Sequence, residues 1–146
     1  MCAAGRLGRK SGAGWYVYED GAKPVPNPDV AALVEAEAER HGISRRPMDD
    51  DAVLNTLLLA LINEAAGLLG EGIAGRAADV DLVLVHGYGF PRFRGGPLFH
   101  ADQIGIATIH EQLKELEAGD PMVWKVAPLI EQLVAGGKGF LDQDAK

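Results

Sequence analysis

The stretch V-H-G-Y-G-F-P-R-F-R-G-G-P-L-F-H-A-D-Q-I-G, residues 85–105, decides how this chain folds. It contains five glycines, two prolines, four aromatic residues and two arginines. Glycine permits positive φ and close backbone approach, and proline fixes φ and removes a hydrogen-bond donor. So dense a mixture predicts a rigid turn. The mostly apolar run 53–62 lies upstream and predicts a helix buried on several sides that leads toward this turn.

Hydrophobic spacing along the rest of the chain predicts an all-α bundle of five to six helices. Asp29 supplies an N-cap type residue for the first helix. The acidic residues 49–51 and the segment 78–81, with Asp79 and Asp81, lie at the starts of the second and third. Pro128 lies inside the last helix, where it should either kink that helix or mark its regular start. The expected helices cover residues 29–41, 48–72, 82–87, 98–105, 106–118 and 122–134.

The first 28 residues differ from this helical pattern. Residues 1–14 are small, basic and rich in glycine, which predicts an irregular arm. The aromatic patch 15–18 predicts a brief strand, and the prolines of 24–28 predict a linker. We therefore expect an N-terminal arm and linker over 1–28, followed by a helical domain over 29–146.

Composition excludes several classes of function. The chain has 146 residues with 47% hydrophobic and 24% charged residues, as expected for one globular domain. Its net charge of −7 argues against a general nucleic-acid binder. The single cysteine, Cys2, excludes an intramolecular disulfide and fits a reducing compartment. No leader peptide is apparent, and the run 53–62 is too short to span a bilayer. We expect a soluble, cytoplasmic protein without nucleic-acid or membrane partners.

The pair Asn63 and Glu64 follows the most apolar run of the chain. A carboxylate at a buried helix position must be paired, hydrogen-bonded or protonated. Glu64 could therefore be a general acid or base with a raised pKa. Alternatively, Asn63 and Glu64 could bind backbone amides of the glycine turn. We favour the structural interpretation, because no histidine or cysteine lies nearby in sequence as a catalytic partner.

Two features of the turn invite a ligand. Gly87 and Gly89 resemble the opening of a dinucleotide loop, but the preceding segment is predicted to be helical and the third glycine is missing, so we expect no nucleotide there. Arg92 and Arg94 could hold a phosphate or carboxylate. We favour pairing within the chain instead. The candidate carboxylates for that pairing are Glu64, Asp79, Asp81 and Asp102.

Metal and nucleophile chemistry find little support in the sequence. His86, His100 and His110 could form a metal site with Asp102, but no H-x-x-x-H or H-x-H spacing occurs. No G-x-S-x-G motif is present, and Cys2 lies on the irregular arm. We expect no catalytic, cofactor-binding or metal-binding residue in this chain.

Three segments together resemble a known family. The runs L-I-N-E-A-A-G-L-L-G-E-G-I-A (61–74) and D-L-V-L-V-H-G-Y-G-F-P-R-F-R-G-G-P-L-F-H-A-D-Q-I-G (81–105) resemble the C-terminal domain of 3-hydroxyacyl-CoA dehydrogenases. The likeness is greatest to the second, terminal copy in multifunctional fatty-acid β-oxidation enzymes. The segment G-R-K-S-G-A-G-W-Y-V-Y (8–18) resembles the motif that closes the first copy, with Trp15 in place of the usual Phe.

This resemblance implies a helical bundle of the 6-phosphogluconate dehydrogenase C-terminal-like type. In the family, NAD and the catalytic His–Glu pair belong to a separate Rossmann domain, which has no counterpart here. The resemblance implies a module that packs against an equivalent copy, in a homodimer or within one chain, with the Rossmann domain in cis or in trans. The residues expected to brace the turn and the interface are Asn63, Glu64, Asp81, Gly87, Gly89, Pro91, Gly95, Gly96, Asp102 and Gly105.

The function that the resemblance implies is therefore indirect. The whole enzyme would oxidise 3-hydroxyacyl-CoA to 3-oxoacyl-CoA with NAD in fatty-acid β-oxidation, and this chain alone would be inactive. The alternative is a stand-alone module that binds acyl-CoA through Arg92 and Arg94, or a partner that works in trans with a separately encoded Rossmann protein.

Overall fold

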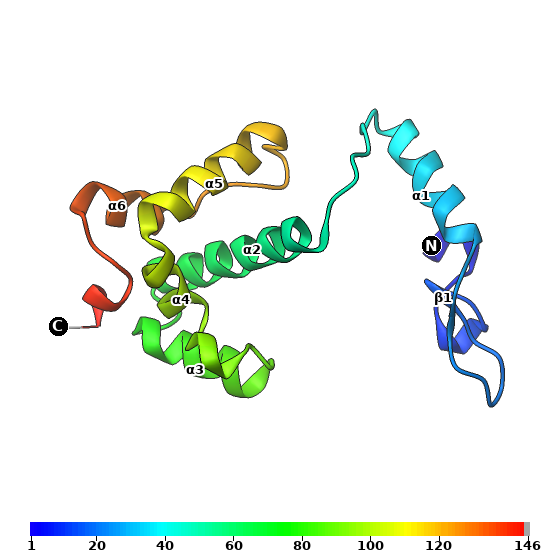
Figure 1. The fold of residues 1–146 in the computed structure, drawn as a ribbon, viewed down its shortest axis with the longest axis horizontal. Coiled ribbons are helices and arrows are strands. Elements are labelled where there is room, and N and C mark those ends of the chain that lie inside the picture. Colours follow the sequence, from blue (N-terminus) through cyan, green and yellow to red (C-terminus); the bar gives the residue numbers. More distant parts are fainter. Residues whose placement is uncertain (145–146) are drawn as a thin grey trace. The chain divides into compact units, whose positions relative to one another are not determined.

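The computed structural model describes residues 1–144 of the chain. These residues form two compact units, of which the first is Met1–Pro47 and the second begins at Met48. Six α-helices and one two-stranded sheet make up their regular structure, together with short 3-10 turns. The predicted all-α class is confirmed (Figure 1).

The N-terminal unit contains a small hairpin. Two 3-10 turns, η1 (Cys2–Ala4) and η2 (Arg9–Ser11), precede strands β1 (Tyr16–Val17) and β2 (Val25–Pro26), which pair antiparallel. The aromatic strand was predicted correctly, but the proline segment is its partner strand and not simply a linker. Pro26 is tolerated because a two-stranded sheet has only edge strands, where a missing N–H leaves no ladder bond unmade.

Helix α1 (Asp29–Arg40) belongs to this N-terminal unit. The predicted N-cap residue is wrong by one position, because Pro28 is the N-cap and Asp29 is the first helical residue. The side chain of buried Asn27 accepts the N–H of Asp29 at 3.1 Å. The Asn27 amide also donates to the Gly14 carbonyl at 3.0 Å, and Arg6 pairs with Asp29 at 2.7 Å. These bonds join α1 to the arm within the compact unit Met1–Pro47.

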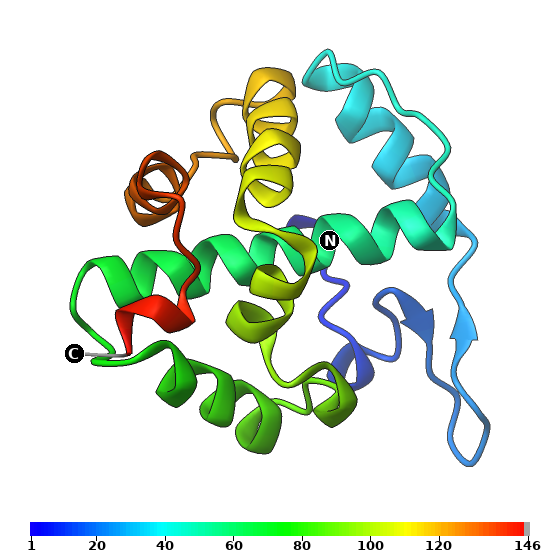
Figure 2. The ribbon, with the colours of Figure 1, turned by 60° about the vertical axis from the view of Figure 1, so that its left-hand side comes forward.

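The second unit is built around α2 (Asp50–Gly70), which begins where the Asp49 side chain accepts the N–H of Ala52 at 2.8 Å. The other helices pack along its length (Figures 1 and 2). The remaining elements are α3 (Ala77–Gly87), η3 (Arg92–Arg94), α4 (Pro97–Ile104), α5 (Ile106–Gly119), α6 (Pro128–Gly136) and η4 (Leu141–Gln143).

The core of this unit collects two to four side chains from each helix. Ile62 of α2 is completely buried, as is Phe140 from the segment after α6. The other large, fully buried side chains are Leu98, Ile109, Leu113, Ile130 and Leu133. The last helix was predicted too long at its start, because α6 begins only at Pro128. Proline is favoured in the first helical turn, where its missing N–H has no intrahelical partner to lose.

Helix α2 is longer than the apolar run alone suggested. Over residues 1–144 it is the one helix with the length and composition needed to cross a membrane. One side of it nevertheless packs into the core through Leu59, Ile62, Ala65 and Ala66. Core helices of globular domains can have the same length and composition.

Candidate functional site

The turn after α3 is anchored by Asp81. This buried carboxylate accepts the backbone N–H groups of Leu98 at 2.8 Å and Phe99 at 2.9 Å. These donors lie in the first turn of α4, so Asp81 caps α4 from a different helix. Gly96 permits the approach, because its φ is 127° and any Cβ there would overlap the Asp81 carboxyl group. The close approach of the Asp81 carboxylate to the Gly96 backbone therefore explains both residue types.

Asp102 has the equivalent role one element later. Its carboxylate accepts the N–H groups of Phe140 at 2.8 Å and Leu141 at 3.0 Å, at the start of η4. A Cβ on Gly139 would come within 2.8 Å of the same carboxylate, so the segment after α6 can approach Asp102 only because glycine precedes Phe140. The fully buried Phe140 ring is thereby fixed against the core.

Asp144 completes the set. Its carboxylate accepts the N–H groups of Ala77 at 2.7 Å and Ala78 at 3.0 Å, at the start of α3 (Figure 2 shows η4 close to this helix). A residue on α3 thus caps α4, one on α4 caps η4, and one beyond η4 caps α3. We call Asp81, Asp102 and Asp144 the aspartate ring. Each member binds two main-chain donors, so the ring is a structural device.

The electrostatic environment of Asp81 reflects its burial. Removal from water raises the pKa of Asp81 above its usual range, and the nearby carboxylates of Asp102 and Asp144 act in the same direction. The hydrogen bonds from Leu98 and Phe99 oppose this rise. Burial therefore disfavours the ionised form of the Asp81 carboxyl group, and the two capping hydrogen bonds partly offset this effect.

Asn63 and Glu64 do not act on the glycine turn. The Asn63 amide donates to the Lys125 carbonyl at 2.8 Å, and its oxygen accepts the N–H of Ala127 at 2.9 Å. Asn63 therefore holds the segment that leads into α6. Glu64 is exposed and makes no hydrogen bond or ion pair with residues 1–144, so the expectation of a buried carboxylate was wrong. The preceding apolar run gave no indication of which helix face points outward.

Arg92 and Arg94 pair with none of the four carboxylates proposed for them. Arg94 lies 3.0 Å from the His100 ring nitrogen, and its guanidinium is 5.8 Å from the centre of the Phe93 ring. Burial lowers the pKa of His100 below its usual range, and the charge of Arg94 adds to this effect. Arg92 is exposed and has no bonding partner within residues 1–144. Neither charge is neutralised by a carboxylate in the described part of the chain.

The other predicted turn residues shape the chain between α3 and α5. Gly87 is the last residue of α3, and Gly89 follows with φ 75°. Pro91 precedes η3, Gly95 ends it with φ 79°, and Gly105 separates α4 from α5 with φ 103°. Positive φ is readily available only to glycine, which explains the residue type at Gly89, Gly95 and Gly105. Whether they also form an interface remains a prediction.

An apolar groove runs along α2 and α3 beside this turn. It consists of two adjoining hollows of about 590 and 410 Å³ that share Leu61, Leu84 and Tyr88. Tyr88 is 79% exposed, and Phe93 at one end of the groove is 87% exposed. The further apolar lining residues are Leu54, Leu57, Leu58, Phe90, Pro91, Ala65, Leu68, Ile73, Ala74, Val80 and Val83.

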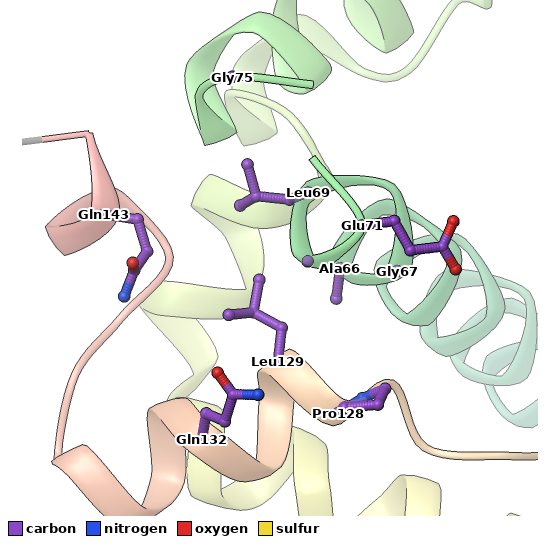
Figure 3. Close-up of a pocket in the computed structure, with 10 residues that line it drawn as sticks. Ala66, Gly67, Leu69, Glu71, Gly75, Pro128, Leu129, Gln132 and Gln143 are labelled. Atoms are coloured by element: carbon purple, nitrogen blue, oxygen red, sulfur yellow. The ribbon is translucent and has the colours of Figure 1, made fainter. Parts of the chain in front are cut away.

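A second hollow, between the end of α2 and the start of α6, has mixed polarity. Leu69 and Leu129 border it, and Figure 3 shows Gln132 and Gln143 on one side with the Glu71 carboxylate on the other. A Cβ on Gly70 would come within 3.2 Å of Leu129, so these helices pack closely beside it. No charged groups converge on this hollow, and it offers no reactive arrangement.

The described residues do not fit a dinucleotide. The fingerprint requires a strand before the glycine turn, whereas Gly87 closes a helix. The sheet within residues 1–144 is the antiparallel hairpin of the N-terminal unit. The same residues contain no group of three or more His, Cys, Asp or Glu side chains that could hold a metal ion.

Sequence reasoning missed Asp144. The sequence pointed to this cap only indirectly. Helix α3 begins after Arg76, and the Arg76 side chain does not cap the helix. A helix that lacks its own N-cap requires acceptors from elsewhere. Nothing in the sequence identified Asp144 among the many acidic residues as that acceptor.

Comparison with known proteins gives a consistent result. Residues 53–141 match the family described as 3-hydroxyacyl-CoA dehydrogenase, C-terminal domain. The chain is 38% identical to a peroxisomal bifunctional enzyme of Danio rerio over 94% of its own length and 20% of the relative's. For the Homo sapiens enzyme of that name, the values are 38%, 88% and 18%.

A plant relative gives a similar result. The peroxisomal fatty acid beta-oxidation multifunctional protein AIM1 of Arabidopsis thaliana is 36% identical, over 94% of this chain and 20% of the relative. The chain thus spans about a fifth of the length of the curated relatives it matches.

Proposed function

This chain belongs to the family of 3-hydroxyacyl-CoA dehydrogenase C-terminal domains, as its sequence motifs predicted, and we propose that it is the helical association module of such an enzyme. In this role it supplies a folded contact surface. The dinucleotide site and the reacting groups belong to another domain, joined in cis or supplied in trans.

The apolar groove is the observation that carries this proposal. Soluble domains rarely leave a long contiguous apolar surface exposed, and such surfaces usually receive a partner. Here the surface lies on the longest helix and continues onto an aromatic turn. The buried polar side chains, Asn27 and Asp81, by contrast bind main-chain groups. The described residues contain no converging set of reactive side chains.

The proposed activity of the whole enzyme is oxidation of 3-hydroxyacyl-CoA to 3-oxoacyl-CoA, with NAD as the hydride acceptor, in fatty-acid β-oxidation. The name of the plant relative contains that pathway, which supports the assignment. Within the chain, the misfit of the glycine turn to a dinucleotide supports a division of labour between domains. The partner is proposed to be a second copy of the domain, with a Rossmann domain beside it.

A turnover assay tests the division of labour. The purified chain, incubated with NADH and acetoacetyl-CoA, is expected to oxidise NADH no faster than the buffer blank. Titration with NADH is expected to leave its fluorescence unchanged. Turnover well above the blank would place reacting groups in this chain and end the proposal.

A second candidate function is favoured by the two arginines of the turn. Arg92 and Arg94 lack carboxylate partners within residues 1–144, so a phosphate of acyl-CoA could occupy this position. Titration with acyl-CoA tests it: lost binding in the Arg92→Ala, Arg94→Ala variant with unchanged thermal unfolding would favour a binding module. Loss of self-association instead would favour the association module.

We infer that the protein acts inside the cell. Two observations point to different compartments, the cytoplasm and the peroxisome. The single exposed Cys2 fits a reducing compartment such as the cytoplasm, which the sequence predicted. The relatives in animals and Arabidopsis are named as peroxisomal. Fractionation of cells that produce the native protein, with cytosolic and peroxisomal markers, distinguishes the two.

A further inference from the structure

We propose that Arg94 and His100 form a proton-linked binding site for a phosphate monoester, in which the phosphate replaces the direct hydrogen bond between the two side chains and His100 takes up a proton. This inference rests on the second candidate function, anion binding at the arginines of the turn. It deepens that function, because it adds the histidine, the charge of the ligand and the pH dependence of its affinity.

The contact between Arg94 and His100 fixes the protonation state of the histidine. The Arg94 guanidinium lies 3.0 Å from the His100 ring nitrogen Nε2. A guanidinium has only donors, so Nε2 must accept this hydrogen bond with its lone pair. The ring is therefore neutral, and its proton is on Nδ1. The imidazole occupies the place in which an arginine usually holds an anionic oxygen.

Protonation of His100 would break this contact. A proton on Nε2 would place two positively charged donors 3.0 Å apart, where like charges repel. A dianion between the two side chains makes both interactions attractive, because its oxygens accept from Arg94 and from the protonated ring. The site thus has two arrangements, a direct bond with a neutral histidine and an anion bridge with a charged one.

The surroundings keep His100 neutral in the direct arrangement. Burial lowers the pKa of His100, and the charge of Arg94 lowers it further. The carboxylates of Asp81 and Asp102 bind main-chain donors instead of the ring. The other titratable groups on the elements packed against α4, which make no contribution to this shift, are Asp50, Asp51, Glu64, Asp79, His86, Arg92, His110, Glu111, Lys114, Glu115, Glu117 and Asp142. A bound dianion would oppose the effect of Arg94 and favour the charged ring.

The turn before α4 presents a further group that suits a phosphate. Arg92 is exposed and has no bonding partner within residues 1–144. The Arg94 N–H donates to the Pro91 carbonyl at 3.0 Å and the Gly95 N–H to the Arg92 carbonyl at 3.1 Å, which holds the turn in one conformation. One guanidinium occupies both oxygens of a carboxylate, whereas a phosphate monoester offers three oxygens to Arg92, Arg94 and His100.

Phe93 bears on the source of the phosphate. Its ring is 87% exposed, and its centre lies 5.8 Å from the Arg94 guanidinium. An exposed aromatic ring beside cations can stack on the base of a nucleotide. A nucleotide would therefore use the ring and the cations together, whereas free phosphate would use the cations alone. Both share the same phosphate chemistry, and their affinities distinguish them.

Calorimetric titration of the full chain at pH 7 tests the site with adenosine monophosphate, inorganic phosphate and adenosine. Adenosine monophosphate is expected to bind about tenfold or more tightly than adenosine, because the charged contacts require the phosphate. Tighter binding of the nucleotide than of inorganic phosphate would support a nucleotide ligand, and equal affinities would support free phosphate. If neither phosphate compound binds, the proposal is overturned.

The same titrations measure the proton linkage. Repetition in buffers of different ionisation enthalpy is expected to show net proton uptake on binding. Above the second pKa of the phosphate, about 6, affinity should fall as pH rises, because His100 must then take its proton from a more dilute supply. Affinity that is unchanged or rises with pH in this range would contradict the linkage.

His100→Gln is the variant that isolates the histidine. Its side-chain amide can still accept from Arg94 but does not titrate, so proton uptake should disappear and the affinity for adenosine monophosphate at pH 7 should fall about tenfold. Arg94→Gln should weaken binding at least as much. His110→Gln on α5 is the matched control and should change neither quantity. Proton uptake that persists in His100→Gln would overturn the proposal.

Nitrogen NMR of the His100 ring gives a measurement on the natural chain, which holds even if a variant fails to fold. At pH 7 the chain alone should carry its proton on Nδ1, and saturating phosphate should protonate both ring nitrogens. A proton on Nε2 without phosphate would overturn the proposed arrangement. If acetyl-CoA fails to bind while adenosine monophosphate binds, the second candidate function fails and the phosphate site stands. The turnover assay decides the division of labour independently.

Discussion

The aspartate ring and the apolar groove both draw on α3, yet they treat their residues in opposite ways. Asp81 is a charged residue that is buried, and its carboxylate binds two main-chain donors. Val83, two residues further on, is apolar and 58% exposed. The usual correspondence between polarity and exposure is inverted at both positions.

This inversion separates two tasks. Buried polar groups must be hydrogen-bonded, so a satisfied ring fixes the relative positions of α3, α4 and η4. Exposed apolar groups contribute little to the isolated fold and retain their transfer free energy for a partner. We expect changes in the ring to lower the free energy of unfolding, and changes in the groove to lower association instead.

Within the ring, the largest loss is expected at its tightest point. Gly96→Ala should lower the free energy of unfolding by about 3 kcal/mol, because a strained φ costs about 1–3 kcal/mol and displacing Asp81 leaves buried donors unpaired. Urea denaturation measures the loss. Gly67→Ala in α2 is the matched control: it has room for a Cβ at helical φ and should be stabilising by about 0.5–1 kcal/mol. Equal losses at both positions would contradict the close approach of Asp81 to the Gly96 backbone.

A smaller loss is expected at Asp144. Removal of its carboxylate by Asp144→Ala leaves the first two N–H groups of α3 without their acceptor and should cost about 1–2 kcal/mol. Because Asp102 holds the start of η4 and Asp144 follows η4, the two losses should not be additive. A double-mutant cycle with Asp102→Ala measures this coupling, and strictly additive losses would show that the ring is not a unit.

The positions of the helices in the sequence could be predicted from local signals. Which side of each helix is buried and which is exposed could not. Asp49 was recognisable as the start of α2, and Pro128 as a residue that could begin a helix, because capping and proline geometry depend only on neighbours in sequence. Glu64 was misplaced because α2 is apolar on nearly all sides, so its sequence contains no stripe that distinguishes core from groove.

Long-range bonds set the rest of the site. The structural role of Asp81 in the turn was predicted, but its cap on α4 depends on a chain reversal at Gly96 that spacing alone does not reveal. Asn63 binds residues more than sixty positions away, and Asp144 does the same. The partners of Arg92 and Arg94 were predicted wrongly for the same reason: sequence named carboxylates, and packing placed none of them within reach.

A pH titration sharpens the description of the ring. The pKa of Asp81 is raised in the folded state, chiefly by burial, so the folded chain binds a proton more readily than the unfolded chain. The resulting stabilisation is fully present below the unfolded-state pKa, about 3.9, and is lost as pH rises through the folded-state pKa. The stability of the natural chain relative to Asp81→Asn should therefore fall with rising pH in that window. A relative stability that rises there would mean that the capping bonds outweigh burial.

The smallest effect is expected in the groove, and it gives the sharpest contrast with the ring. Leu57 and Leu59 lie two residues apart on α2, but Leu57 is 59% exposed and Leu59 only 3%. Leu57→Ala should change the free energy of unfolding of the monomer by no more than about 0.5 kcal/mol, whereas Leu59→Ala should cost about 2–5 kcal/mol. Urea denaturation at protein concentrations below the dimer dissociation constant compares them. At higher concentration the Leu57 variant should lose the additional stability that association gives the natural chain. A large loss at Leu57 in the monomer would assign the groove to the fold and not to a partner.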